Sequence, residues 1–136
     1  MRATFPLFLA TFCLLAALVP AHAGEPPAVY IIDPEDGAEV SSPVTVRFGL
    51  RGMGVAPAGV EMAGTGHHHL LVDTGLPPAG LPIPKDEHHL HFGAGQTETT
   101  LELSPGKHTL MLLLGDFAHV PHDPPVVSEP VTITVR

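Results

Sequence analysis

The sequence predicts an all-β fold, an antiparallel sandwich of about seven short strands. Two observations predict it. Short runs rich in Val, Ile, Leu and Thr recur along the chain, and turn residues separate them. Proline and glycine also interrupt the chain so often, with 16 Pro and 14 Gly among 136 residues, that no helical period of apolar residues is sustained.

The first 23 residues have the layout of a secretory signal peptide. Arg2 supplies a positive charge, an apolar run extends over residues 5–19, and Ala21 and Ala23 form an A-x-A cleavage site. We therefore expect residues 1–23 to be a cleaved signal peptide and residues 24–136 to form a single β-sandwich domain. This predicts a periplasmic or secreted protein with no membrane association after cleavage.

Removal of the signal peptide changes the composition of the chain. It leaves 113 of the 136 residues, enough for one modest core, and removes Cys13, the one cysteine. Without Arg2, five basic residues face fourteen acidic ones, which gives a net charge of −9. Such a surface repels nucleic acid and anionic lipid and favours cations as partners.

Seven strands are expected in the mature chain, each bounded by turn residues. They cover residues 29–32, 44–50, 67–73, 88–92, 97–103, 107–114 and 126–135, the last one broken at Pro130. Val44, Val46, Phe48 and Leu50 alternate with polar residues and should face the core. The turn residues 104–106 (Ser-Pro-Gly) predict a hairpin between the fifth and sixth strands.

Several motifs resemble known bacterial proteins. Residues 34–46 and 103–110 resemble the A–B and E–F segments of immunoglobulin-like modules. The strings GHHHLL (66–71), HLHFG (89–93), GQTE (95–98) and HVPHDPP (119–125) resemble a family of small exported proteins described as a domain of unknown function. The resemblance extends over residues 29–135 and implies an immunoglobulin-like periplasmic sandwich, but it implies no activity.

The histidines predict a metal site. Nine of the ten lie beyond the signal peptide, and all but His108 fall into three clusters, 67–69, 88–91 and 119–122. Residues two apart on a strand share a face, so His67 and His69 point together, as do His89 and His91. A strand with H-x-H therefore presents two imidazoles that can chelate one ion.

In an immunoglobulin-like sandwich, the three histidine clusters would meet at one pole. We expect three or four of their histidines to bind one transition-metal ion. Copper or zinc suits imidazole ligands best, nickel or iron less well, and the mature chain has no thiolate. The predicted ligands are His67, His69, His89, His91, His119 and His122, with Asp123 as the carboxylate partner.

Other polar residues near these motifs have simpler interpretations. His108 starts a strand at the opposite pole, where it is expected to be a structural corner residue. His68 and His88 are expected to pack or to donate a ring N–H to a carbonyl or carboxylate. Asp116 is interpreted as a turn residue, with two other roles left open, metal ligand and hydrogen-bond acceptor for a ligand. Glu98 is interpreted as a solvated strand residue.

The preferred function is a non-enzymatic metal-binding module that buffers, senses or hands on an ion, with a periplasmic protein as a further partner. A solvated histidine surface without a physiological metal is the simplest alternative. A metalloenzyme is another, because the paired H-x-H motifs resemble those of cupins, although the expected glutamate is missing and only Asp73 lies nearby. The third is a structural or partner-binding sandwich whose histidines respond to pH.

Overall fold

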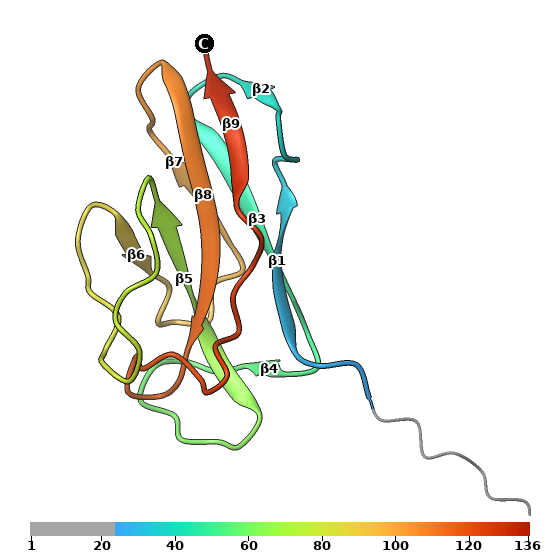
Figure 1. Ribbon diagram of the computed structural model, residues 1–136, viewed down its shortest axis with the longest axis vertical. Helices are drawn as coiled ribbons and strands as arrows, with labels where there is room; N and C mark the ends of the chain where they lie inside the picture. Colours follow the sequence, from blue (N-terminus) through green and yellow to red (C-terminus); the bar gives the residue numbers. More distant parts are fainter. Residues whose placement is uncertain (1–23) are drawn as a thin grey trace, which may run out of the picture.

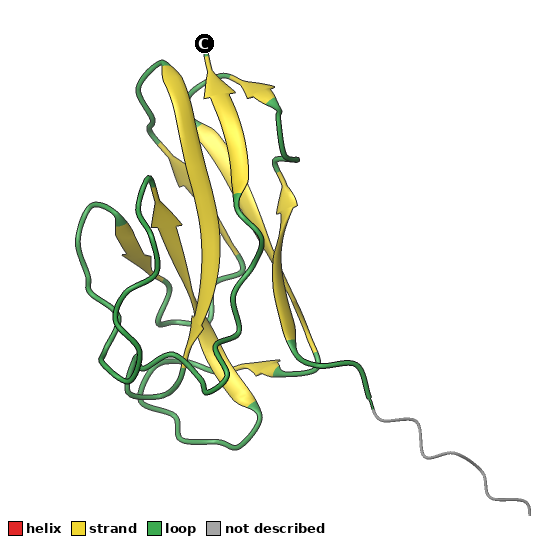
Figure 2. Cartoon of the chain, in the orientation of Figure 1, coloured by secondary structure: helices red, strands yellow, loops and turns green. Residues whose placement is uncertain are grey.

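The computed structural model describes residues 24–136, and the predicted signal peptide lies outside these residues. The described chain contains strands and loops but no helix, so no helix in it is long and apolar enough to cross a membrane (Figure 2). The strands are β1 (Ala28–Asp33), β2 (Glu39–Val40), β3 (Val44–Arg51), β4 (Gly54–Val55), β5 (Thr65–Val72), β6 (His89–His91), β7 (Glu98–Leu101), β8 (Gly106–Gly115) and β9 (Val131–Val135).

These strands form two sheets that pack against each other (Figure 1). One sheet has the order β1-β3-β7, and the other has the order β2-β9-β8-β5-β4, with β6 paired to β5. The two-residue strands β2 and β4 pair in parallel and the other strands pair antiparallel. The predicted all-β sandwich is confirmed, while its immunoglobulin-like assignment stays a prediction.

The core between the sheets follows the expected alternation. Val44, Val46 and Phe48 are buried and Leu50 packs against them, whereas Arg47 is exposed on the other face of β3. The second sheet contributes a row of buried Leu, Ile and Val residues from β5, β8 and β9, namely Leu70, Val72, Leu110, Leu112, Leu114, Ile133 and Val135. Burial of these side chains is the main stabilising contribution to the fold.

One predicted detail of the strands is wrong, and for the last strand the break predicted at Pro130 is confirmed. The fifth and sixth predicted strands, which correspond to β7 and β8, form no hairpin, because β7 pairs with β3 and β8 lies in the other sheet between β5 and β9. The Ser-Pro-Gly connection crosses between the sheets, which lets Leu101 and Leu110 enter one core from opposite sides. The last strand begins only after Pro130, and an isolated bridge between Leu113 and Val127 is its only earlier pairing.

The centre of the six-stranded sheet is buried on both faces. Loops that follow β5 and β8 fold over its outer face, on the left and at the lower end in Figure 1. Beneath them a second, smaller core forms from Leu71, Ile83 and Leu113, with Met111 and Val127 packed against it. This second core places side chains of β5, β8 and the loop after β5 in a sheltered layer outside the sandwich.

Candidate metal centre

Strand β5 directs its three histidines to opposite faces of the sheet. His67 and His69 lie on the outer face, on the side of Leu71, and His68 lies on the inner face with Leu70. All three histidines are buried. The predicted alternation of this segment is therefore confirmed, and two adjacent imidazoles are enclosed beneath the outer loops.

Two further imidazoles join this pair from other segments. His91 of β6 lies directly opposite His69 in the antiparallel pairing, and His119 lies in the loop that follows β8. The ring centroid of His119 is 5.1 Å from that of His67 and 4.7 Å from that of His91. The six distances between ring centroids in this set range from 4.7 to 6.1 Å. We call His67, His69, His91 and His119 the histidine cluster.

The geometry of the cluster fits a metal ion. One ring nitrogen from each of His67, His91 and His119 lies within 4.8 Å of the other two. Two imidazole nitrogens on a tetrahedral zinc ion are roughly 3.3 Å apart, given metal–nitrogen bonds of about 2.0–2.1 Å. The three nitrogens would have to approach one another by up to about 1.5 Å to reach that spacing. His69 is already adjacent, because its Nε2 is 3.0 Å from Nε2 of His67.

Several nitrogens of the cluster lack hydrogen-bond partners within residues 24–136. These buried atoms are Nδ1 of His67, Nδ1 of His69 and Nε2 of His91. A buried polar atom without a partner is costly, so such groups are rare and call for a structural or functional reason. A metal ion would supply that reason for the nitrogens that it binds.

The surroundings keep these imidazoles neutral, as metal ligation requires. Burial, reinforced by the neighbouring His91 and His119, lowers the pKa of His67 from 6.5 to about 4, although Asp116 opposes the change. Burial and the imidazoles of the cluster lower the pKa of His69 to about 3. Burial and His119 also lower the pKa of His91. At neutral pH each ring therefore keeps one nitrogen lone pair, although a cation would have to displace the hydrogen bond between Nε2 of His67 and Nε2 of His69 to use the one engaged there.

Two glycines provide room for the rings. A Cβ atom on Gly93 would lie 2.3 Å from Cε1 of His91, and one on Gly115 would lie 2.8 Å from Nε2 of His69. Real Cβ contacts are essentially never this short, so both positions exclude larger residues while the rings stay in place. Sequence reasoning treated both glycines only as turn residues. The position of Gly93 just after the second H-x-H motif was an available signal, whereas Gly115 comes close to the first motif only through the pairing of β8 with β5.

The other three predicted ligands lie outside the cluster. The ring of His89 donates from Nδ1 to Asp86 at 2.8 Å. The buried Nε2 of His122 faces β5, because a Cβ on Gly66 would be 2.9 Å from it. Asp123 is exposed.

The remaining histidines have the structural roles that the sequence predicted. His68 packs against Phe48 with 5.2 Å between ring centroids, and Nδ1 of His88 donates to the carbonyl of Val72 at 2.9 Å. His108 donates from Nδ1 to Asp73 and from Nε2 to the carbonyl of Ser104.

The predicted roles of Asp116 and Glu98 are also confirmed. Oδ1 of Asp116 accepts the backbone N–H groups of Ala118 and Val120, which makes Asp116 a turn residue. Glu98 is exposed and pairs with Arg47 across the β3–β7 ladder.

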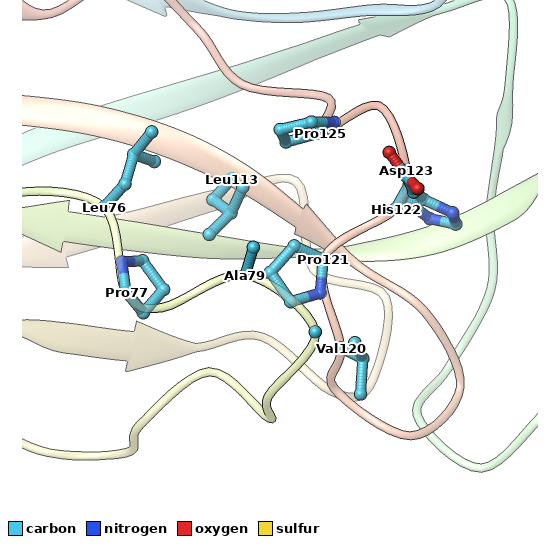
Figure 3. A pocket seen from close by; sticks show the side chains of 10 residues that line it. Leu76, Pro77, Ala79, Leu113, Val120, Pro121, His122, Asp123 and Pro125 are labelled. Atoms are coloured by element: carbon cyan, nitrogen blue, oxygen red, sulfur yellow. The ribbon is translucent and has the colours of Figure 1, made fainter.

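A mostly apolar pocket lies beside the cluster on the same face of the sheet. It has a volume of about 510 Å³, and its floor includes Leu113, the residue paired with His69. Figure 3 shows Leu113 between Leu76 on one side and His122 with Asp123 on the other. Val120 lines the pocket as well, so the pocket and the cluster share the loop that carries His119.

Comparison with known proteins identifies a family but no activity. No curated protein and no solved structure matches the chain. The family model described as Domain of unknown function (DUF4399) matches residues 46–136, which include every strand from β4 onward and all four histidines of the cluster. This match covers more than half of the chain, and the protein belongs to that family.

Proposed function

We propose that this protein is an exported module that binds one transition-metal ion, copper or zinc, through the histidine cluster. His67, His91 and His119 are the ligands, and His69 is the fourth imidazole. The observation that carries the proposal is the convergence of three ring nitrogens within 4.8 Å, from two strands and a loop. The module buffers the ion or passes it to a periplasmic protein, and catalyses no reaction.

The chemistry of the donors supports copper or zinc over harder cations. The cluster offers neutral imidazoles, whereas magnesium and calcium prefer oxygen ligands. The lowered pKa values of His67 and His69 favour binding, because a metal need not displace protons from them near neutral pH. The acidic surface of the mature chain attracts any cation and supports the same proposal.

The test is a metal titration of the tag-free protein produced from the full-length sequence. Cu²⁺, Zn²⁺ and Ni²⁺ are each titrated in competition with a chelator of known affinity. One variant combines His67→Ala, His69→Ala and His91→Ala. A matched control combines His88→Ala, His89→Ala and His122→Ala, which removes the same number of imidazoles outside the cluster.

One-to-one binding tighter than about 1 μM, lost in the cluster variant and kept in the control, supports the proposal. Circular dichroism of each variant establishes that it is folded before the titration. Weak binding at several stoichiometries, with both variants losing affinity alike, would show an unspecific histidine surface instead. That result would reject the proposal.

A metal-dependent enzyme is the second candidate, and the apolar pocket beside His119 favours it. An enzyme needs an exchangeable coordination position, whereas four imidazoles can close a tetrahedral site. Azide added to the Cu²⁺-loaded protein distinguishes the two. A changed visible spectrum indicates an open position next to the pocket and supports the enzyme, and an unchanged spectrum supports the binding module.

A further inference from the structure

The backbone of His119 has an unfavourable conformation. Its φ of 67° lies in the left-handed region. Among residues 24–136, Asp73 is the only other non-glycine residue with a positive φ. A non-glycine residue stays in this region only when its surroundings fix it there. The conformation turns the His119 ring toward His67 and His91, with centroid distances of 5.1 and 4.7 Å.

Asp116 accepts hydrogen bonds that fix the two peptide groups on either side of His119. The N–H of His119 donates to the backbone carbonyl of Asp116 at 3.0 Å. The N–H of Val120 donates to Oδ1 of the Asp116 carboxylate at 2.9 Å, and Ala118 donates to the same oxygen at 2.8 Å. In addition, the N–H of Asp116 donates to the carbonyl of Val120 at 2.8 Å, which closes the turn.

The loop between β5 and β6 fixes the remaining backbone polar group of His119, its carbonyl. The carbonyl of His119 accepts a hydrogen bond from the N–H of Ile83 at 2.8 Å. Ile83 is anchored in turn, because its side chain is buried against Leu71 and Leu113 in the outer core. The loop that carries His119 is therefore closed on itself at Asp116 and joined through Ile83 to the outer core.

We propose that Asp116 is a positioning residue of the metal site, whose carboxylate holds His119 in the left-handed conformation that directs its imidazole to the ion. The inference rests on the proposed function of the cluster. Asp116 acts through its two backbone partners, Ala118 and Val120, and is not itself a ligand. Its negative charge also faces His67, so the test has to separate hydrogen bonding from charge.

Two variants separate these contributions. Asp116→Asn removes the charge but keeps an oxygen that accepts both N–H groups, whereas Asp116→Ala removes both. Asp86→Ala is a matched control, because Asp86 likewise accepts backbone N–H groups, but next to His89, outside the cluster. Asp116 lies in the loop after β8, and circular dichroism checks that the sheets of each variant are intact.

The first measurement is Zn²⁺ affinity by chelator competition. We expect Asp116→Ala to weaken binding about 10- to 100-fold, as for other residues that orient metal ligands, and Asp116→Asn to stay within about threefold of the wild type. Asp86→Ala should be unchanged. An Asp116→Ala variant that binds like the wild type would overturn the inference, and so would an Asp116→Asn variant as weak as Asp116→Ala, because charge would then be the cause.

The second measurement needs no metal. A positive φ brings the amide and α protons of one residue close together, which gives His119 a strong intraresidue nuclear Overhauser effect. We expect this signal in the wild type and in Asp116→Asn, and its loss in Asp116→Ala. Its survival in the folded Asp116→Ala variant would overturn the inference. Failure of the wild type to bind either Zn²⁺ or Cu²⁺ would instead reject the proposed function, while this measurement would still test the positioning role.

Discussion

His108 and the histidine cluster show opposite environments for the same side chain. Both ring nitrogens of His108 have acceptors, the carboxylate of Asp73 at 2.7 Å and the carbonyl of Ser104 at 2.8 Å. These bonds raise the pKa of His108. In the cluster, burial lowers the pKa of His67 and His69, and their Nδ1 atoms have no partner within residues 24–136.

This contrast separates a histidine whose two ring nitrogens both have hydrogen-bond acceptors from a candidate metal ligand. An imidazole with two acceptors needs a proton on each nitrogen, so the fold stabilises its cation. An imidazole that is buried among other imidazoles is neutral and keeps a lone pair available. His108 is therefore part of the scaffold, whereas His67 and His69 have the protonation state that a transition metal requires.

The largest expected effect that tests this comparison is the pH dependence of the metal-free protein. The folded pKa values of His67 and His69, about 4 and about 3, lie below the unfolded value of 6.5. The unfolded state therefore binds more protons below pH 6.5, and stability is lost as the pH falls toward the folded pKa values. Between pH 7 and 5 we expect a loss of about 2 kcal/mol for each of these imidazoles.

Urea unfolding of the metal-free protein at both pH values measures this loss. A variant with His67→Gln and His69→Gln should lose much less stability over the same range, because it lacks the two groups that titrate. An unfolding free energy that does not change between pH 7 and 5 in the wild type would contradict the neutral, buried state of the cluster.

The next effect concerns metal affinity and compares two histidines on one strand. His89 and His91 lie on the same face of β6, but only the ring of His91 contacts the cluster. We expect His91→Ala to lower Zn²⁺ affinity about 100-fold, or about 2.7 kcal/mol, and His89→Ala to lower it less than about threefold. Competition titration measures both values. Equal losses in the two variants would place the ion elsewhere.

The smallest expected effect concerns the corner at His108. Its contribution to stability falls as the pH rises, whereas that of the histidine cluster falls as the pH drops. Because the folded pKa of His108 is raised, its pairing with Asp73 stabilises the protein fully below pH 6.5 and is lost as the pH rises above the folded pKa. Asp73→Asn keeps an oxygen for the N–H of Thr109 but removes the charge. We expect it to destabilise the protein by about 0.5–1 kcal/mol at pH 5.5, since the pair is partly exposed to solvent.

The same variant should have less effect at pH 9, because the stabilisation from the protonated pair falls as the pH rises. Thermal unfolding at the two pH values checks this prediction. A destabilisation by Asp73→Asn that is equal at pH 5.5 and 9 would show that the charge of His108 contributes nothing to the corner.

Sequence reasoning succeeded wherever strand periodicity decides which way a side chain faces. The two-residue period of β5 separates His67 and His69 from His68, and the order of the strands brings His91 beside them. The same rule places His89 on the face of His91, but it does not give the orientation of the ring. Asp86, in the preceding loop, captures its ring, and no strand pattern predicts such a local hydrogen bond.

Loop conformation was the second feature that could not be predicted from the sequence. The turn residues before β8 predict a reversal of the chain, but they do not show that the reversal leads into the opposite sheet. The left-handed conformation of His119 depends on hydrogen bonds that Asp116 accepts and on one that Ile83 donates. Ile83 is 36 residues away in the sequence. Contacts of this kind between loops leave no periodic signal in the sequence.

The most direct test of the central claim follows each imidazole while metal is added. Long-range ¹H–¹⁵N NMR spectra of the histidine rings are recorded as one equivalent of Zn²⁺ is titrated into the tag-free protein. We expect large shifts of ring nitrogens in His67, His91 and His119, with His69 following as the fourth ligand, and unchanged signals for His108. Shifts at histidines outside the cluster, with the cluster signals unmoved, would contradict it.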